Sequence, residues 1–382
     1  MSESKQQIPM IDLASEYREI KDEVDGAVHR VLDSGHFILG EEVDAFEHEV
    51  AGHLDVRHAI GVASGSDALL LALMALNIGP GDKVITTPFS FFATASAVVR
   101  LGATPVFCDI DPRTFDLDQG SVRRYLEAFY TPSVKAIIPV HLYGQCCDMD
   151  PMLELARTYS LKVVEDCAQS FGSTYKGRQS GGMGDIGCLS FFPTKNLGGY
   201  GDGGMVTTND DELAEHVRML RVHGARRKYH HEELGINSRL DAMQAAILRV
   251  KLKHVDEWTE RKRVVAAAYD RELSAIDWLQ VPYVMPECRH TYHQYTIKVP
   301  AERRAAIQEA LAQVGIQTQV YYPEPLHRQP CFAGKQELPE EPLNVDAVVP
   351  SVLSLPISRG LKDGDRREVG LVINESGNKA VR

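Results

Sequence analysis

The segment SFFPTKNLGGYGDGG, residues 190–204, contains the lysine best placed to do chemistry. Lys195 follows an apolar run near 187–191 and precedes five glycines within seven residues. Glycines let the backbone approach a ligand closely. A partly desolvated lysine can lose its proton and form a Schiff base with an aldehyde. Most lysines are solvated surface residues, but the flanking aromatics and glycines argue against that interpretation for Lys195.

A second polar group, Glu165, Asp166 and Gln169, lies at the end of another apolar run, near 161–165. Open α/β sheets bind their ligands at the C-terminal ends of the strands. A carboxylate there can hold a positively charged ring nitrogen, and Gln169 can reach the same ligand if the chain turns into a helix. The alternative is a loop carboxylate that caps the next helix, and the motif alone leaves both interpretations open.

The small residues ASGSD, 63–67, precede an apolar helix that we expect over 67–76. A helix N-terminus leaves backbone N–H groups free, and the helix dipole favours an anion there. A plain N-cap by Ser66 explains the same motif without a ligand. A phosphate site therefore needs further partners.

Seven short apolar runs must position these groups. They alternate with helical segments and lie near 58–63, 83–87, 104–108, 135–140, 161–165, 187–191 and 204–208. This alternation predicts an α/β fold in which a mostly parallel seven-stranded sheet is flanked by helices on both faces. The glycine-rich segment 173–185 lacks a helical period, so we expect that one strand there is not simply parallel.

The C-terminal third predicts a second, smaller α/β unit. A helical pattern from Ser238 to about Leu273 contains neither glycine nor proline and is expected to bridge the two parts. Beyond it, Tyr292–Val299 is strand-like, Ala301–Val314 is helical and Ile316–Tyr321 is strand-like. We expect a large domain with N-terminal helices over 1–255 and a small domain over 256–382.

Composition excludes several classes of protein. The 382 residues include 41 Lys and Arg against 53 Asp and Glu, a net charge of −12, which disfavours sequence-independent nucleic-acid binding. The longest wholly apolar run, Ala68–Leu76, is nine residues long and too short to span a bilayer. The seven cysteines form no C-x-x-C pair, the N-terminus has no apolar signal region, and the histidines show no metal-ligand spacing. We therefore expect a cytoplasmic protein with reduced thiols, no membrane segment and no metal.

Together the motifs resemble those of the DegT/DnrJ/EryC1/StrS family of sugar aminotransferases, which have the type I pyridoxal-phosphate fold. The resemblance covers nearly the whole chain. It includes SGHFILG (34–40), SGSDAL (64–69), TPFSFFAT (87–94), PVFCDID (105–111), VHLYG (140–144), EDCAQ (165–169), residues 190–204, GINSRLD (235–241) and PLHRQP (325–330). Each motif is weak alone, but their shared order makes accidental similarity very improbable.

The resemblance implies that the cofactor is pyridoxal 5′-phosphate, with pyridoxamine phosphate formed during turnover. Lys195 would hold the cofactor and then act as the base and acid that moves the proton. Asp166 would pair with the protonated ring nitrogen, Gln169 would hydrogen-bond the ring hydroxyl, and Phe91 would stack on the ring.

The resemblance also implies a phosphate site made by Gly65, Ser66 and Ser190. Asn237 would reach the phosphate of the cofactor in the other subunit, so the protein would be a homodimer with composite sites. His327 would lie near the sugar. The basic loop 226–234 would either contact the nucleotide pyrophosphate or simply be solvated.

The implied reaction transfers an amino group from L-glutamate to a nucleotide-linked ketosugar, in amino-sugar biosynthesis for a polysaccharide or O-antigen. The turn with Tyr200 and Asp202 resembles the branch of the family that acts at C3. The substrate would then be a dTDP-3-keto-6-deoxyhexose or a UDP-3-keto-2-acetamido sugar such as the uronate. One alternative is amination at C4. Another is a pyridoxamine-dependent dehydratase, disfavoured because such relatives replace with histidine the lysine that this chain keeps. A third is a cofactor-binding regulator without turnover.

Overall fold

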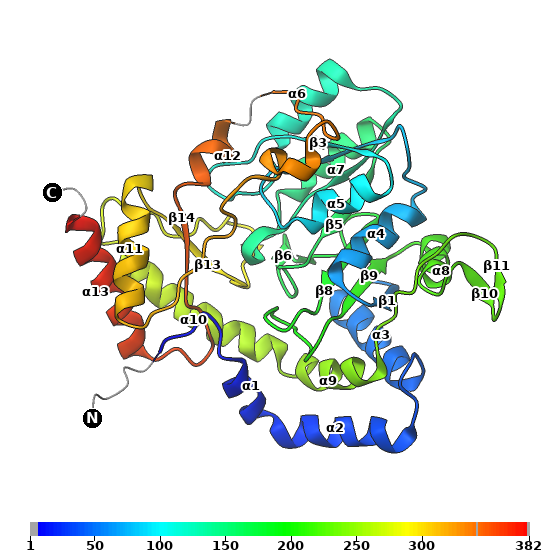
Figure 1. Ribbon diagram of the computed structural model, residues 1–382, viewed down its shortest axis with the longest axis horizontal. Coiled ribbons are helices and arrows are strands. Elements are labelled where there is room, and N and C mark those ends of the chain that lie inside the picture. The colour runs from blue at the N-terminus through cyan, green and yellow to red at the C-terminus, as the bar shows by residue number, and fades with distance from the viewer. Residues whose placement is uncertain (1–6, 341–342, 380–382) are drawn as a thin grey trace.

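The computed structural model describes residues 7–340 and 343–379, and these contain a seven-stranded sheet (Figure 1). In spatial order its strands are β1 (His58–Val62), β9 (Gly204–Thr208), β8 (Ile186–Ser190), β5 (Lys162–Asp166), β4 (Val134–Ile138), β2 (Lys83–Thr86) and β3 (Thr104–Phe107). Neighbouring strands are parallel except that β9 is antiparallel to both β1 and β8. The mostly parallel sheet expected from the seven apolar runs is thereby confirmed.

The crossover between β5 and β8 differs in detail from the prediction. It contains a short antiparallel hairpin, β6 (Thr174–Tyr175) and β7 (Arg178–Gln179), which pairs with β12 (Cys288–Arg289) outside the main sheet. β8 itself is parallel to β5. The main sheet's antiparallel strand is therefore β9, which follows the glycine-rich turn after β8.

Helices cover both faces of the sheet because its strands are apolar on both sides. One face packs against α4 (Gly65–Ala75), α5 (Ala93–Arg100) and α8 (Asp211–Leu220). The other packs against α3 (Glu41–Leu54), α6 (Gln119–Phe129), α7 (Met149–Thr158) and α9 (Ala242–Leu252). The N-terminal helices α1 (Leu13–Glu19) and α2 (Lys21–Ser34) run along the lower edge in Figure 1, where α2 contacts α9.

The prediction of one long helix from Ser238 to Leu273 is wrong. The chain forms two helices, α9 and α10 (Val255–Leu273), separated by Lys253 and His254. Neither residue is a helix breaker, so tertiary packing causes the break. α9 lies in the core beneath the sheet, whereas the C-terminal half of α10 lies in a separate core further along the chain.

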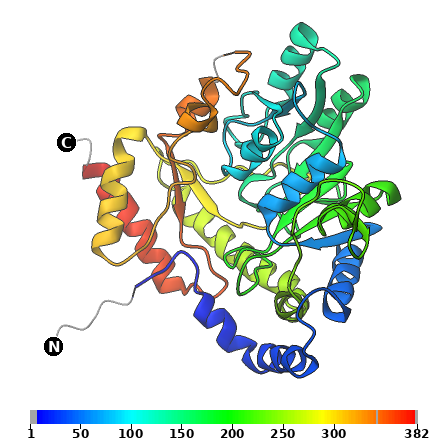
Figure 2. The same cartoon turned by 45° about the vertical axis from the view of Figure 1, so that its right-hand side comes forward.

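That separate core belongs to a smaller α/β unit, which Figure 2 shows beside the sheet. It consists of the antiparallel pair β13 (Tyr295–Lys298) and β14 (Val352–Leu355), with α11 (Ala301–Gln313), α13 (Asp363–Lys379) and part of α10. Between these elements lie α12 (Leu343–Val348) and the 3-10 turns η2 (Leu326–Arg328) and η3 (Pro330–Phe332).

The predicted strand Ile316–Tyr321 is absent from this described unit. Ile316 bridges to Ile8 and Gln319 bridges to Ser354, so this segment forms single bridges to two different segments and no continuous ladder. The domain boundary at residue 255/256 stays a prediction, because α10 contributes Trp258 to one core and Val265 to the other. Among the described helices, none has the length and apolarity needed to cross a membrane.

Candidate active site

A cavity of about 480 Å³ opens at the C-terminal ends of β5 and β8. Seven of the nine residues predicted for the site line it: Gly65, Ser66, Phe91, Asp166, Gln169, Ser190 and Lys195. These residues come from four separate segments, which the strands and their following turns bring to one edge of the sheet. This is the edge at which open α/β sheets bind ligands.

The N-terminus of α4 forms one wall of the cavity. Ser64, not Ser66, caps this helix, since its side chain accepts a hydrogen bond of 3.1 Å from the amide of Asp67. A Cβ atom on Gly65 would lie 2.6 Å from Cβ of Ser190, so only glycine lets the helix end approach β8 this closely. The first-turn amides of α4 have no acceptor within the helix, and together with the hydroxyls of Ser66 and Ser190 they suit a phosphate.

The two acidic residues at the end of β5 point to opposite sides of the sheet, as strand alternation requires. Asp166 lines the cavity. Glu165 is fully buried and accepts hydrogen bonds from His141 and from the amides of Gly181, Met183 and Gly184. Glu165 is therefore structural, and Asp166 is the carboxylate available to a ligand.

Asp166 is held by neighbouring donors. Its Oδ2 accepts 2.7 Å from the hydroxyl of Thr94 and its Oδ1 accepts 3.2 Å from the amide of Ala168. Because the Thr94 proton is used in this way, the Ser90 hydroxyl 2.9 Å away must donate to Thr94 Oγ1. Burial raises the pKa of the Asp166 carboxyl, while the Thr94 hydrogen bond and the Lys195 charge oppose the rise. A cationic ligand atom beside this carboxylate would favour its charged form.

Lys195 lies on the turn after β8, where its amide donates 2.9 Å to the carbonyl of Phe192. Burial lowers the pKa of its amine to about 8, against a smaller opposing effect of Asp166. A substantial fraction of the amine is thus neutral near physiological pH, as a nucleophile or base requires.

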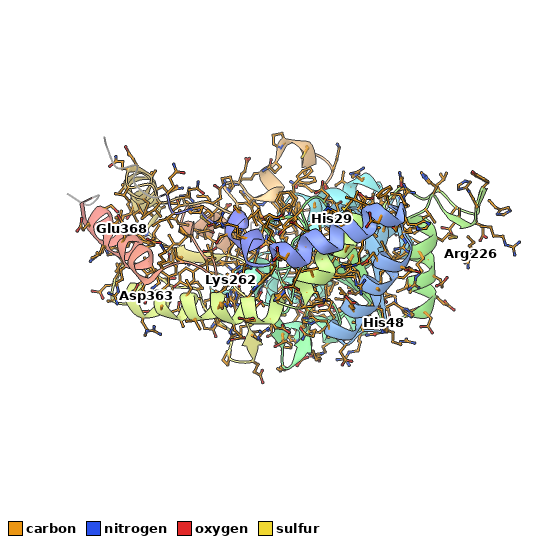
Figure 3. The ribbon with its side chains drawn as sticks, turned by 90° about the horizontal axis from the view of Figure 1, so that it is seen from below. His29, His48, Arg226, Lys262, Asp363 and Glu368 are labelled. Atoms are coloured by element: carbon orange, nitrogen blue, oxygen red, sulfur yellow. The ribbon has the colours of Figure 1, made fainter. Side chains whose placement is uncertain are left out.

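Two lysines, the buried Lys251 and the half-buried Lys262, hydrogen-bond to this turn. Lys262 of α10, labelled in Figure 3, donates 3.0 Å to Oδ1 of Asn196, and the Asn196 amide group donates 3.4 Å to the carbonyl of Thr291. Lys251 of α9 donates to the carbonyl of Gly198. The side chain of Asn196 and the backbone of Gly198, on either side of Leu197, are thereby held by the two helices.

Gln169 has a defined orientation in the cavity. Its Oε1 accepts 2.8 Å from the amide of Tyr143, so its Nε2 is the end that donates, over 2.9 Å, to the hydroxyl of Tyr322. Phe91 also lines the cavity; its side chain is 55% exposed and its ring centroid lies 6.2 Å from that of Tyr322. An exposed aromatic face in a cavity suits stacking on a flat ring.

Two predicted site residues lie elsewhere in the single chain. Asn237 is exposed, forms an isolated bridge with Val222 and lies five residues before α9 rather than at its start. His327 lies in η2, with its ring 6.5 Å from that of Phe107. Neither lines the cavity. The basic loop 226–234 forms part of an exposed hairpin, β10 (Ala225–Arg227) and β11 (His230–His231), and Figure 3 shows Arg226 on this hairpin at one end of the molecule.

Sequence reasoning did not assign several residues of the cavity wall: Ser90, Thr194, His293, Gln294, Tyr321 and Tyr322. It also did not assign Thr94, which lies between Ser90 and Asp166. Ser90 and Thr94 fall within the TPFSFFAT motif, so the sequence could have indicated these two residues as part of the site. His293 is far in sequence from the quoted motifs, and Tyr322 lies three residues before PLHRQP but outside it, so no motif included either residue. Asp202 lines the cavity, whereas Tyr200 packs against Tyr17 of α1 with ring centroids 5.9 Å apart.

One buried group of residues has metal-ligating atoms close together: His141, Glu165 and Cys167. Nδ1 of His141 accepts 3.0 Å from the amide of Cys147, so its Nε2 carries the proton and donates 2.9 Å to Glu165. Both carboxylate oxygens of Glu165 are likewise occupied by backbone amides. Because these atoms already make hydrogen bonds within the protein, we do not propose a metal site here.

The cavity fits pyridoxal 5′-phosphate on four observations. Gly65 lets the α4 N-terminus lie directly against Ser190, Asp166 presents a buried carboxylate, Lys195 presents a partly neutral amine, and Phe91 presents an aromatic face. Each of these four features matches one group of the molecule, in turn the phosphate, the ring nitrogen, the aldehyde and the flat ring.

Comparison with known proteins shows the same class. The family model described as "DegT/DnrJ/EryC1/StrS aminotransferase family" matches residues 18–374. The chain belongs to this family, which confirms the predicted family, and with it the predicted aminotransferase class and pyridoxal-phosphate cofactor.

Two proteins similar to this chain have different kinds of name, one regulatory and one enzymatic. A "Pleiotropic regulatory protein" of Geobacillus stearothermophilus is 48% identical over 95% of this chain and 96% of its own length. A UDP-N-acetyl-3-dehydro-alpha-D-glucosamine 3-aminotransferase of Acidithiobacillus ferrooxidans is 45% identical over 97% of this chain and 98% of its own length. The second name supports the predicted position of amination, C3.

A solved structure has the same fold over the whole chain. The crystal structure of S. venezuelae DesV in complex with a ketimine intermediate has a TM-score of 0.92 and 42% sequence identity. The match covers 98% of this chain and 99% of that one. The predicted type I fold is thereby confirmed.

Proposed function

We propose that this protein transfers the amino group of L-glutamate to C3 of a nucleotide-linked 3-ketosugar, with pyridoxal 5′-phosphate as its cofactor. The observation that carries the proposal is the meeting of Lys195, Asp166 and the α4 N-terminus in one cavity. The name of the 45%-identical relative supports C3 over C4.

When bound, the cofactor supplies a carbonyl carbon that reacts with amines and a ring that withdraws electrons. The residues around it would supply position and charge. Asp166 would pair with the ring nitrogen, Gln169 would donate from Nε2 to the ring hydroxyl, and Phe91 would cover one ring face. Gly65, Ser66 and Ser190 would hold the phosphate.

Lys195 would move the proton that the reaction requires. With its pKa lowered to about 8 by burial, Nζ of Lys195 can accept a proton from the α-carbon of the amino donor and return it to a neighbouring carbon. The turn contacts from Lys262 and Lys251 would keep Nζ in reach throughout. Asp166 favours the protonated amine and would help to hold the proton between these two steps.

The active form would be a homodimer in the cytoplasm. Asn237 is exposed in the single chain, consistent with a contact to the cofactor phosphate of the other subunit. His327 would contact sugar only if the substrate extends beyond the cavity, which it does not line. All seven cysteines are free thiols, as is usual in a reducing compartment.

A regulator without turnover is the second candidate, favoured by the name of the 48%-identical relative. The two candidates differ in their response to the amino donor. An aminotransferase loaded with pyridoxal phosphate loses its absorbance near the visible range when L-glutamate is added, and releases 2-oxoglutarate. A regulator binds the cofactor but leaves both readouts unchanged.

The experiment adds L-glutamate alone to the loaded protein and measures the spectrum and 2-oxoglutarate together. The proposal predicts one 2-oxoglutarate per subunit. Lys195→Ala should release none, and Lys135→Ala, which changes an exposed lysine near the start of β4, should match the wild type. An unchanged spectrum with glutamate, at full cofactor occupancy, contradicts the proposed donor and favours the regulator.

A further inference from the structure

A second, smaller cavity adjoins the active site. Its volume is about 160 Å³, and it shares four wall residues with the main cavity: Thr194, His293, Gln294 and Tyr321. Its remaining walls are Met10, Ile11, Leu13 and Gln317. The side cavity is thus apolar on the N-terminal segment and polar toward Lys195.

Two polar atoms on the shared wall lack partners among the described residues. His293 is 3% exposed and its Nδ1 has no hydrogen bond, and Gln294 is 8% exposed and its Oε1 has none. A buried acceptor left unpaired costs free energy, because it has lost its hydrogen bond to water and gained none in the protein. A ligand N–H or O–H that donates to Gln294 Oε1 would remove that cost. This wall therefore favours a ligand with a hydrogen-bond donor.

The side cavity is also electrically neutral. Neither arginine, lysine, aspartate nor glutamate occurs among its described wall residues. Burial, together with the charges of Lys195 and Lys262, holds the pKa of His293 well below its usual range, so its ring is uncharged. A carboxylate in this cavity would be desolvated without a partner.

We propose that this cavity receives the 2-acetamido group of the sugar, an inference that rests on the proposed function. The N–H of that group would donate to Gln294 Oε1, and its methyl would contact Met10, Ile11 and Leu13. A 6-deoxy sugar offers a methyl group but no N–H, and a uronate carboxylate would find no lysine or arginine among the described wall residues of this cavity. The substrate class is therefore a UDP-linked 3-keto sugar with an N-acetyl group at C2.

Equilibrium binding to the pyridoxamine-phosphate form tests this without turnover. We expect UDP-N-acetylglucosamine to bind at least tenfold more tightly than UDP-glucose in calorimetry. Gln294→Ala should reduce this preference to less than threefold and leave UDP-glucose binding unchanged. Leu13, the first residue of α1, lies on the apolar wall. Leu13→Trp would place a larger side chain in the cavity and should also remove the preference. Gln313→Ala on the exposed end of α11 is the control.

Each outcome bears on the inference. Equal affinity for the two nucleotide sugars in the wild type, or a preference that survives both substitutions, overturns it while leaving aminotransfer intact. Failure of the wild type to bind either nucleotide sugar, together with no response to L-glutamate, overturns the proposed function as well.

Discussion

Thr94, in the first turn of α5, donates its hydroxyl proton to Asp166 at the end of β5, across 2.7 Å. This bond links the helix that follows Phe91 to the carboxylate expected to face the cofactor ring nitrogen. It acts against burial, which raises the pKa of Asp166. Thr94 thus favours the charged form of the carboxylate against the effect of burial.

Replacing Thr94 with valine should weaken cofactor binding by about tenfold or more, because a hydrogen bond to a charged group contributes about 1.5–3 kcal/mol. The measurement is the dissociation constant of pyridoxal phosphate by absorbance titration. Thr94→Ser keeps the hydroxyl and should stay within threefold of the wild type. Equal binding by the valine variant would show that Thr94 does not support the charge.

Glu165 and Asp166 are adjacent in sequence, but replacing each by its amide should have different effects on the free energy of unfolding. Glu165→Gln places an NH₂ group against backbone amides that now donate to the carboxylate, and should lower the free energy of unfolding by about 2 kcal/mol or more. Asp166→Asn should leave the apoprotein as stable as the wild type or more so at pH 7, because burial already disfavours the charged carboxylate.

Urea unfolding of the two apoproteins, with activity of the loaded forms, checks this pair. Asp166→Asn should lose activity without any loss of stability. A large loss of stability in Asp166→Asn, or none in Glu165→Gln, would reverse the assignment of the two carboxylates.

The sheet was predictable because its strands are short apolar runs bounded by glycine, proline and aspartate. The chemical residues at its C-terminal edge were predictable for the same reason, since Asp166 and Lys195 directly follow such runs. The break between α9 and α10 was not, because Lys253 and His254 have no helix-breaking chemistry and only the two separate cores explain the change of direction. The N-cap was misplaced by two residues because Ser64 and Ser66 are equally good caps in sequence.

The pH dependence of Lys195 can be measured directly. We expect its amine in the apoprotein to titrate with a midpoint near pH 8, well below the ordinary lysine value of about 10.4. Asp166→Asn should move the midpoint lower still, because the carboxylate favours the ammonium form. Reductive ¹³C-methylation and NMR report the titration, with the Lys195 signal assigned by its loss in Lys195→Arg. A midpoint near 10, or a rise in the Asp166→Asn variant, contradicts the description of the site.

A composite dimer predicts complementation between two defective subunits. Lys195→Ala should be inactive, and Asn237→Ala should lose about 1–3 kcal/mol of phosphate binding. In a mixed dimer one site keeps both Lys195 and the Asn237 of the opposite subunit, so mixing should restore part of the activity. Subunit exchange, followed by differently tagged chains, is the control. Proven exchange without recovery would remove Asn237 from the other subunit's site.

The residues on the wall shared by the two cavities could not be predicted from the sequence. His293 and Gln294 lie about a hundred residues after Lys195, in the segment that leads into β13, and no motif connects them. Only the packing of the small unit against the turn brings them to the cavity. Asn237 illustrates the converse, since its predicted role depends on a second chain.

The position of the new C–N bond tests the central claim most directly. The loaded enzyme is supplied with L-glutamate and a UDP-N-acetyl-3-dehydro-glucosamine generated in situ by an upstream oxidoreductase, and in parallel with dTDP-linked 3-keto- and 4-keto-6-deoxyhexoses. Proton NMR of the products should place nitrogen at C3, with the N-acetylated UDP sugar turned over fastest. Efficient amination of the 4-keto sugar at C4, with no nitrogen at C3 in any product, would contradict the proposed reaction.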